Sequence, residues 1–308
     1  MRTKATTAAA ALACAIVLAG WGPHDRGKQT AADDGPKVEL ITRGEHPKRL
    51  RYRHEDAEQW ARMTMRFGQT MSIDGAEMPG PQMPATVSLM RVTTKPADGG
   101  AAMTSTIVEM KADGDSPAAA MMNSVYQGIT GVTIAGHVDE RGRFSDMHTD
   151  MGQGLDPQLA QMIEGTEQSM NQMTVPMPDE PVGVGGSWRV TQQIDANGMH
   201  FAQTLTATVT AIDGDVVTLT IDQHAEVPEQ DIDSPMLPPG STLHVTSGTG
   251  QGGGTQVINL RRVMADHAEV ETSFKFQMEI RTDGAAPQKL DQTVSTSMTL
   301  EPAQDPGT

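Results

Sequence analysis

The sequence predicts a mainly β (α+β) protein with two curved antiparallel sheets, or half-barrels, and one long helix. Three observations predict this class: apolar and polar residues alternate along many segments, an Asp-Gly turn joins two of them, and one longer segment has helical spacing. In residues 269–280, Val270 and Phe274 fall on one face, whereas Glu271 and Lys275 fall on the other. This alternation is typical of an antiparallel strand with one face in the core and the other in water.

Alternation of the same kind predicts further strands along the chain. They are expected at residues 62–67, 85–92, 104–110, 129–138, 241–246, 255–263 and 292–300. Two more, 205–209 and 217–221, flank the Asp-Gly-Asp sequence of residues 213–215, which predicts a β-hairpin. The glycine-rich residues 247–255 lie between two expected strands and precede no helix, so they predict a mobile hairpin loop rather than a phosphate-binding loop.

The long helix of the expected fold spans about residues 156–173. Asp156 is placed to cap its N-terminus, and Pro157 suits the first helical position. Its apolar residues recur at helical spacing, and they are Leu159, Met162, Ile163, Met170 and Met173. A shorter helix is expected to begin at Ser116 and Pro117.

The chain divides by composition into consecutive parts. They are a signal peptide at 1–20, a disordered linker at 21–37, an N-terminal β-rich half with the helix at 38–178, a C-terminal β-rich half at 179–302, and a tail at 303–308. Prolines and glycines between residues 175 and 190 indicate the crossing from one half to the other. Each half places a tryptophan, Trp60 or Trp188, at the head of a strand. Duplication and chance explain this weak likeness equally well.

The first residues have the layout of an export signal. Arg2 and Lys4 form a basic start, and an apolar segment follows that is too short to cross a bilayer. The segment ends in Leu-Ala-Gly-Trp, where bacterial lipoproteins carry Leu-Ala-Gly-Cys. Because the indole of Trp21 has no thiol to acylate, no lipid anchor is expected there. Cys14, the only cysteine, is either an ordinary apolar residue of the signal or an alternative acylation site.

The expected mature chain is strongly acidic and lacks cysteine. Removal of residues 1–20 takes away two bases and no acids, so the formal charge changes from −16 to −18, with 21 bases against 39 acids. This charge disfavours nucleic acid and anionic membrane surfaces as partners, and it also suits simple solubility. Without cysteine the mature chain forms no disulfide, thiolate metal site or cysteine nucleophile.

Methionine replaces the larger apolar residues to an unusual degree, with 22 methionines against 5 phenylalanines and 2 tyrosines. Many of the methionines fall on the apolar faces of expected strands. Flexible thioethers fill irregular cores and also adapt to varied apolar ligands. The sequence therefore leaves open an ordinary core and a cavity for an apolar small molecule.

One methionine-rich segment could bind copper. Met147, His148 and Met151 combine thioethers with an imidazole, and these ligands suit Cu(I). If the segment is a strand, Met147 and Met151 share a face and His148 points away from it.

Two His-x-Glu pairs could bind zinc. His224 with Glu226, and His267 with Glu269, would each project from one face of a strand. Two such pairs on neighbouring strands could hold a zinc ion, although exposed histidine and glutamate on a sheet need no metal.

Residues 136–147 (GHVDERGRFSDM) and 178–188 (PDEPVGVGGSW), with the lipoprotein-like start, resemble an uncharacterised family of exported bacterial proteins, many of them lipid-anchored. The resemblance covers most of residues 50–300, and its motifs are turns rather than catalytic sequences. It implies a β-rich fold and an envelope location. More distantly, the expected architecture is similar to periplasmic lipoprotein carriers and related lipid-binding half-barrels.

The sequence as a whole predicts an exported, non-enzymatic protein of the bacterial periplasm, cell envelope or extracellular space. No nucleophile, base and orienting group come together in it, so no catalytic residue and no cofactor are expected. The expected partner is an apolar small molecule or an envelope protein, and the mature chain should contain no transmembrane helix. The alternative is a copper or zinc protein, or a metal-dependent enzyme that uses the His-x-Glu pairs.

Overall fold

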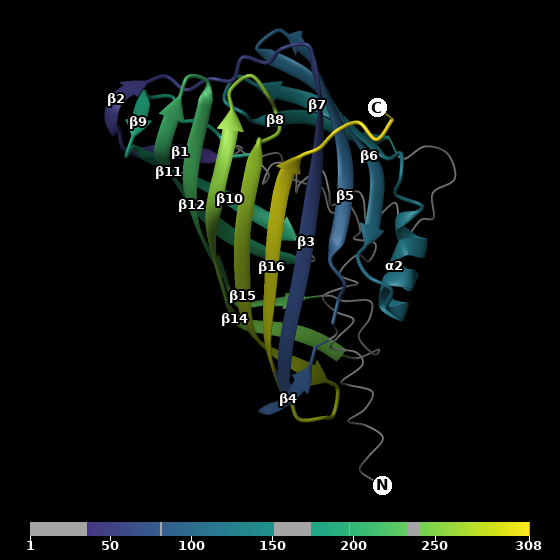
Figure 1. Cartoon of the computed structure of the whole chain (residues 1–308). Helices are drawn as coiled ribbons and strands as arrows, with labels where there is room; N and C mark the ends of the chain where they lie inside the picture. The colour runs from purple at the N-terminus through teal and green to yellow at the C-terminus, as the bar shows by residue number, and fades with distance from the viewer. Residues whose placement is uncertain (1–35, 81, 151–173, 197, 233–240, 308) are drawn as a thin grey trace.

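The computed structural model describes residues 36–80, 82–150, 174–196, 198–232 and 241–307, and these confirm the mainly β class (Figure 1). Over these residues the elements are β1 (Lys37–Thr42), β2 (Glu45–Lys48), β3 (Ala57–Ile73), β4 (Ala76–Pro79), β5 (Thr86–Ala97), β6 (Gly100–Ala112), α2 (Pro117–Tyr126), β7 (Thr133–Asp139), β8 (Phe144–Asp150), β9 (Val182–Val184), β10 (Ser187–Ala196), β11 (Met199–Asp213), β12 (Val216–Val227), β13 (Gln230–Ile232), β14 (Ser241–Asn259), β15 (His267–Thr282) and β16 (Gln288–Pro302). The expected signal peptide, most of the linker and the helix at 156–173 lie outside the described residues.

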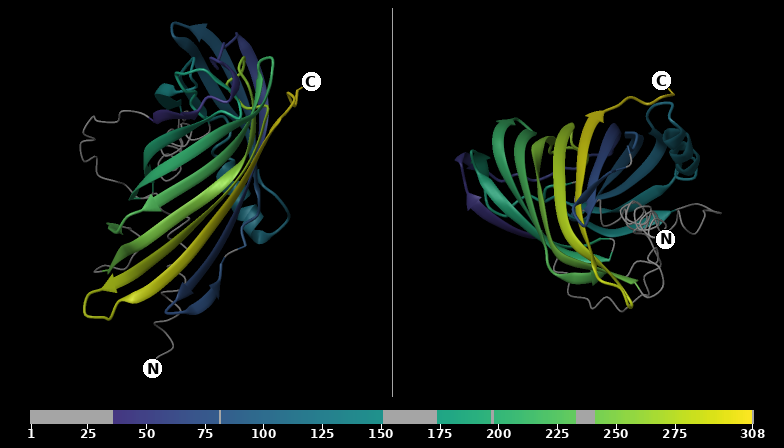
Figure 2. Two further views of the ribbon diagram at one scale, coloured as in Figure 1. Left: turned by 90° about the vertical axis from the view of Figure 1, so that its left-hand side faces the viewer. Right: turned by 90° about the horizontal axis from the view of Figure 1, so that it is seen from below.

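Fourteen of the strands form one antiparallel sheet. Its main order is β1-β10-β11-β12-β14-β15-β16-β3-β5-β6-β7-β8, with β13 on β14 and β4 on β3, while β2 and β9 form a small second sheet. The sheet is open, with β1 and β8 at its edges, and Figure 2 shows that its long strands twist and curve into a trough.

The two expected halves do not form separate sheets. β16 pairs with β3 from Leu290↔Ile73 to Pro302↔Ala61, so the C-terminal strands continue into the N-terminal ones. The physical reason is that each half would otherwise expose a long unpaired edge, and pairing satisfies its backbone N–H and C=O groups.

Most of the expected strands and turns are present. The hairpin of β11 and β12 turns at Gly214, whose φ of 57° lies in the left-handed region that glycine favours. The expected short helix is α2, in which the Ser116 side chain accepts a hydrogen bond from the backbone N–H of Ala119 and Pro117 occupies the first turn.

The mobile loop expected at residues 247–255 is wrong, because these residues lie inside β14. They pair with β12 on one side and with β15 on the other. Glycine is needed there for close packing: a Cβ on Gly250 would lie 2.5 Å from the Phe274 ring, and one on Gly248 would lie 2.8 Å from Val227. The strand expected at 255–263 is the end of β14, which stops at Asn259.

One face of the sheet is apolar and carries most of the core. The larger of its two main clusters, here the Trp188 cluster, comprises Leu50, Tyr52, Val175, Met177, Val182, Trp188, Val190, Ala207, Val209, Val217, Leu219, Ile221, Ile258 and Leu260. The second, here the Leu243 cluster, comprises Met71, Ile194, Phe201, Ala225, Val227, Ile232, Leu243, Val245, Met278, Ile280 and Leu290. The opposite face, here the polar face, carries the alternate residues of the same strands.

Candidate functional site

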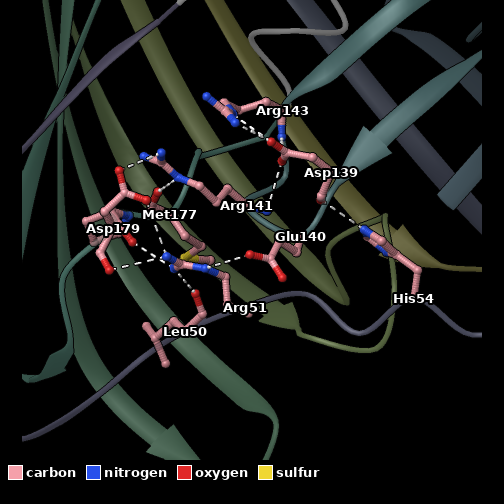
Figure 3. A network of polar contacts seen from close by, with 10 residues as sticks. Leu50, Arg51, His54, Asp139, Glu140, Arg141, Arg143, Met177 and Asp179 are labelled. Atoms are coloured by element: carbon pink, nitrogen blue, oxygen red, sulfur yellow. Dashed lines mark hydrogen bonds and ion pairs between the residues drawn. The ribbon is translucent and has the colours of Figure 1, made fainter. Parts of the chain in front are cut away.

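The two turn motifs of residues 136–147 and 178–188 contribute to one polar network (Figure 3), here called the clasp. The clasp consists of Arg51, Asp139, Glu140, Arg141 and Asp179. Arg141 lies in the β7–β8 turn, Asp179 precedes β9, and Arg51 lies between β2 and β3. Because β7 and β8 lie at one end of the strand order and β10 lies near the other, the clasp joins opposite sides of the sheet.

The two arginines of the clasp bind mainly backbone oxygens. Arg141 donates from Nε to the carbonyl oxygen of Met177 at 2.8 Å, and Arg51 donates to that of Pro178 at 2.8 Å. Both side chains are largely buried, at 14% and 17% exposure, whereas Asp179 is 71% exposed. Ion pairs to so exposed a carboxylate contribute little, so the bonds to the carbonyl oxygens supply most of the clasp's stability.

Asp139 fixes the conformation of the β7–β8 turn. Its carboxylate accepts hydrogen bonds from the backbone N–H groups of Arg141 and Arg143, at 2.8 and 2.9 Å, and from the Arg143 side chain. Burial acts to raise the pKa of Asp139, but the hydrogen bonds from Arg143 and Arg141 outweigh it and hold the pKa below its usual value. This carboxylate therefore stabilises the fold at neutral pH, and its contribution is lost as the pH falls through the lowered pKa.

Two rings line the clasp on its inner side. His54 stacks on Tyr52, with ring centroids 5.5 Å apart, and its Nε2 lies 3.2 Å from the carbonyl oxygen of Asp139. Burial lowers the pKa of His54 and raises that of Tyr52. A Cβ on Gly142 would lie 2.8 Å from the Tyr52 ring, so this turn requires glycine. The clasp connects separate elements of the fold. Its charged side chains already interact with carbonyl oxygens or with charged neighbours.

The structure does not bring the two His-x-Glu pairs together. His224 and Glu226 are exposed on β12, with 3.5 Å between Nε2 and Oε1, whereas His267 and Glu269 lie at the start of β15. β14 separates the two strands, so the pairs do not lie on neighbouring strands, the arrangement in which they could hold a zinc ion. His224 is paired with Gln251 of β14 and His267 with Val257, positions about 20 Å apart along the strand.

Only two of the expected copper ligands lie in the described part of the chain. The thioether of Met147 packs against an apolar cluster that includes Ile134 and Val138, while His148 is exposed and its Nδ1 lies 3.3 Å from the carbonyl oxygen of Asp146. Met151 lies outside the described residues. Within the described ranges, no group of three or more His, Cys, Asp or Glu residues is arranged to hold a metal ion.

The methionine-rich strands form a distinct region in the middle of the apolar face. This central patch consists of Met65 and Phe67 of β3, Val294 and Met298 of β16, and Val270 and Phe274 of β15. Cross-strand pairing places them side by side, as in Met65↔Met298↔Val270. Unlike the buried clusters that flank them along these strands, these side chains are only partly buried, and Phe67 is 39% exposed.

His244 lies in a cluster that the sequence did not predict. Its side chain is 8% exposed, its Nδ1 lies 2.7 Å from Asp231, and its Nε2 lies 3.0 Å from Glu229. Both ring nitrogens therefore lie within hydrogen-bond distance of a carboxylate. The cluster holds β13 against β14, and both nitrogens are already used. The sequence predicted a strand at 241–246, but the pairing of β13 with β14, which brings the two carboxylates to His244, was not visible in it.

We expect His244→Gln to loosen β13, because a glutamine cannot bridge both carboxylates. The loss should be about 1–3 kcal/mol, and amide hydrogen exchange of residues 229–232 should accelerate. His224→Gln on the exposed part of β12 is the matched control and should leave both quantities unchanged. Equal exchange in the two variants would contradict the role of His244.

Comparisons with other proteins give a limited result. A family model described as "Family of unknown function (DUF6263)" matches residues 162–262, which include β9 to β14. No curated protein matches the chain in sequence. Among the described residues, no helix is long and apolar enough to cross a membrane.

The outer membrane protein OprG from Pseudomonas aeruginosa is similar over 82% of this chain and 98% of its own, with 8% identity and a TM-score of 0.23. The β domain of the Bordetella autotransporter BrkA is similar over 79% of this chain and 99% of its own, with 11% identity and a TM-score of 0.13. Both scores are too low to carry an argument. In sequence, the chain is therefore similar over residues 162–262 to a family of unknown function.

Proposed function

We propose that this chain is an exported, non-enzymatic protein of the bacterial cell envelope that binds an apolar small molecule on the central patch. The observation that carries the proposal is the incomplete burial of that patch, which lies along β3, β15 and β16 between the Leu243 cluster and a smaller buried cluster of Ala61, Met90, Ala268 and Leu300. Thioether, phenyl and methyl groups from three adjacent strands lie together there, and none of the six side chains titrates.

The chemistry of the patch suits an apolar ligand. Met65 and Met298 are flexible and polarisable, so they adapt to ligands of varied shape. The rings of Phe274 and Phe276 stack with centroids 6.0 Å apart, and Phe201 meets Phe274 edge-on at 6.0 Å. Phe274 and Phe276 pack against the Leu243 cluster and so connect it to the patch. On the neighbouring strand β14, the residues paired with these rings are glycines, which have no side chains to cover the patch.

The first test is native mass spectrometry of the protein expressed with its own N-terminus and purified from the envelope of a bacterial host. We expect a mature species that begins near Gly20, without an acyl group, and carries an apolar adduct that denaturation removes. A full-length chain in the cytoplasm would contradict export, and a metal adduct in place of the apolar one would favour the alternative of a metal-binding protein.

A paired substitution tests the patch directly. Met65→Gln with Met298→Gln should weaken binding of the fluorescent fatty acid cis-parinaric acid by more than about tenfold, because two apolar contacts become polar. Thr64→Gln with Thr299→Gln is the matched control, since these two residues pair with each other on the opposite face. Equal binding by both double variants, or no binding by the original protein, would contradict the proposal.

A further inference from the structure

The polar face has a hollow of about 660 Å3 that crosses four adjacent strands. It is lined by residues 66–68 of β3, 295–297 of β16, 271–273 of β15 and 251–253 of β14. Each strand thus contributes three consecutive residues at the same level of the sheet. At this level β14, β15 and β16 are paired on both sides, whereas residues 66–68 of β3 pair with β16 alone.

Strand alternation assigns this hollow to the polar face. Residues directly opposite each other share a face, so one row is Gly253, Glu271, Ser297 and Arg66, and the next is Gln251, Ser273, Ser295 and Gly68. Both complete rows line the hollow, and so does the row between them, Gly252, Thr272, Thr296 and Phe67, whose side chains belong to the other face. The large apolar residues that flank this row on the other face, such as Met65 and Phe274, do not line the hollow, so it opens on the polar face. The central patch and the hollow share Phe67 alone.

Small residues make the hollow. Gly68 and Gly253 have no side chain, and Ser273, Ser295 and Ser297 end at a hydroxyl group. Between the longer side chains of Arg66, Glu271 and Gln251, the backbone of the sheet is therefore not covered by large side chains. Glycine inside a strand weakens it and often marks a place where a ligand approaches the backbone closely.

Two opposite charges lie within the hollow without pairing. Arg66 and Glu271 are exposed, and among the described residues neither forms an ion pair or a side-chain hydrogen bond. β16 lies between their strands, so their Cα atoms are two strand spacings apart, roughly 10 Å. Elsewhere on this face charges pair locally, as Arg281 does with Glu279 at 3.1 Å.

We propose that the hollow binds a short zwitterionic peptide that lies across the strands. The guanidinium of Arg66 would bind the terminal carboxylate, Glu271 would bind the terminal ammonium, and the serine hydroxyls would bind the peptide groups between them. Three extended residues span about 10 Å, which matches the separation of the Cα atoms of Arg66 and Glu271. This inference does not rest on the proposed function, because the two sites use opposite faces.

Trialanine is a suitable probe because it has no side-chain specificity. We expect titration calorimetry of the full chain to detect trialanine binding at millimolar concentration, and Arg66→Gln or Glu271→Gln to weaken it about tenfold or more. The amide of trialanine lacks the carboxylate and N-acetyl-trialanine lacks the ammonium. Arg66→Gln should therefore not weaken binding of the amide further, and Glu271→Gln should not weaken binding of the acetylated peptide further.

Arg62→Gln is the matched control, because Arg62 is on the same face of β3 but outside the hollow. It should bind trialanine as the original protein does, and circular dichroism should show that all variants are folded. Absence of trialanine binding, equal losses in Arg62→Gln and Arg66→Gln, or binding of maltotriose in place of the peptide would each overturn the proposal. Loss of fatty-acid binding at the central patch would leave the proposal for the hollow unaffected.

Discussion

Trp188→Ala should lower the free energy of unfolding by about 3–5 kcal/mol, the range found when large aromatic side chains are removed from a core. Trp188 is fully buried and is the largest such side chain among the residues that the structure describes. Its Nε1 also donates a hydrogen bond to the carbonyl oxygen of Pro176 at 2.9 Å, so the variant leaves both a cavity and an unpaired acceptor. Urea unfolding followed by circular dichroism measures the loss.

Trp60 provides the control for this prediction, because it occupies the corresponding place at the head of β3. Trp60 is only partly buried; its Nε1 donates to the Glu58 side chain, and the Arg91 guanidinium lies 6.0 Å from the ring centroid. Such exposed contacts contribute about 1 kcal/mol or less, so Trp60→Ala should cost far less than Trp188→Ala. Equal losses would show that the Trp188 cluster is not the main core.

Arg141→Met should open the clasp and cost about 1.5–3 kcal/mol, the range for a hydrogen bond to a charged group. Methionine keeps much of the apolar length of arginine but cannot donate to the carbonyl oxygen of Met177. Amide hydrogen exchange should accelerate at Met177 and Tyr52, whose N–H groups donate to the carbonyl oxygens of Arg141 and Glu140 at 2.9 and 2.7 Å.

Arg143→Met, in the same turn, distinguishes the contribution of the clasp from that of the turn conformation. Arg143 is half exposed and pairs only with Asp139 among the described residues, so its loss should destabilise the turn without releasing Met177. If both variants released Met177 equally, the clasp would owe its stability to the turn conformation and not to Arg141.

The strands could be predicted because their period of two residues is local. The hairpin at Gly214 and the cap at Ser116 also depend on neighbouring residues alone. The glycines of β14 were misassigned because their reason is not local: Gly250 is small because Phe274, from the next strand, lies against it. Glycines that predicted a flexible loop from the sequence are therefore required by packing between strands.

The candidate sites depended on strand order, which the sequence did not contain. A zinc site built from His224 and His267 needs neighbouring strands, but β14 lies between theirs. His244 was missed for the related reason that β13, only three residues long, supplies the carboxylate of Asp231. Arg141 and Asp179 lie in turn motifs that the sequence did identify, but their meeting depends on a contact across 38 residues.

The pairing of β16 with β3 also constrains the order of folding. The strand β16, which joins the two halves, lies more than 200 positions after its partners in β3. Contacts of such high sequence separation form slowly, and until they form β3 and β15 each present a long bare edge. A chain in which β16 has not yet been synthesised therefore cannot complete the sheet. Until then the edges of β3 and β15 remain accessible to chaperones.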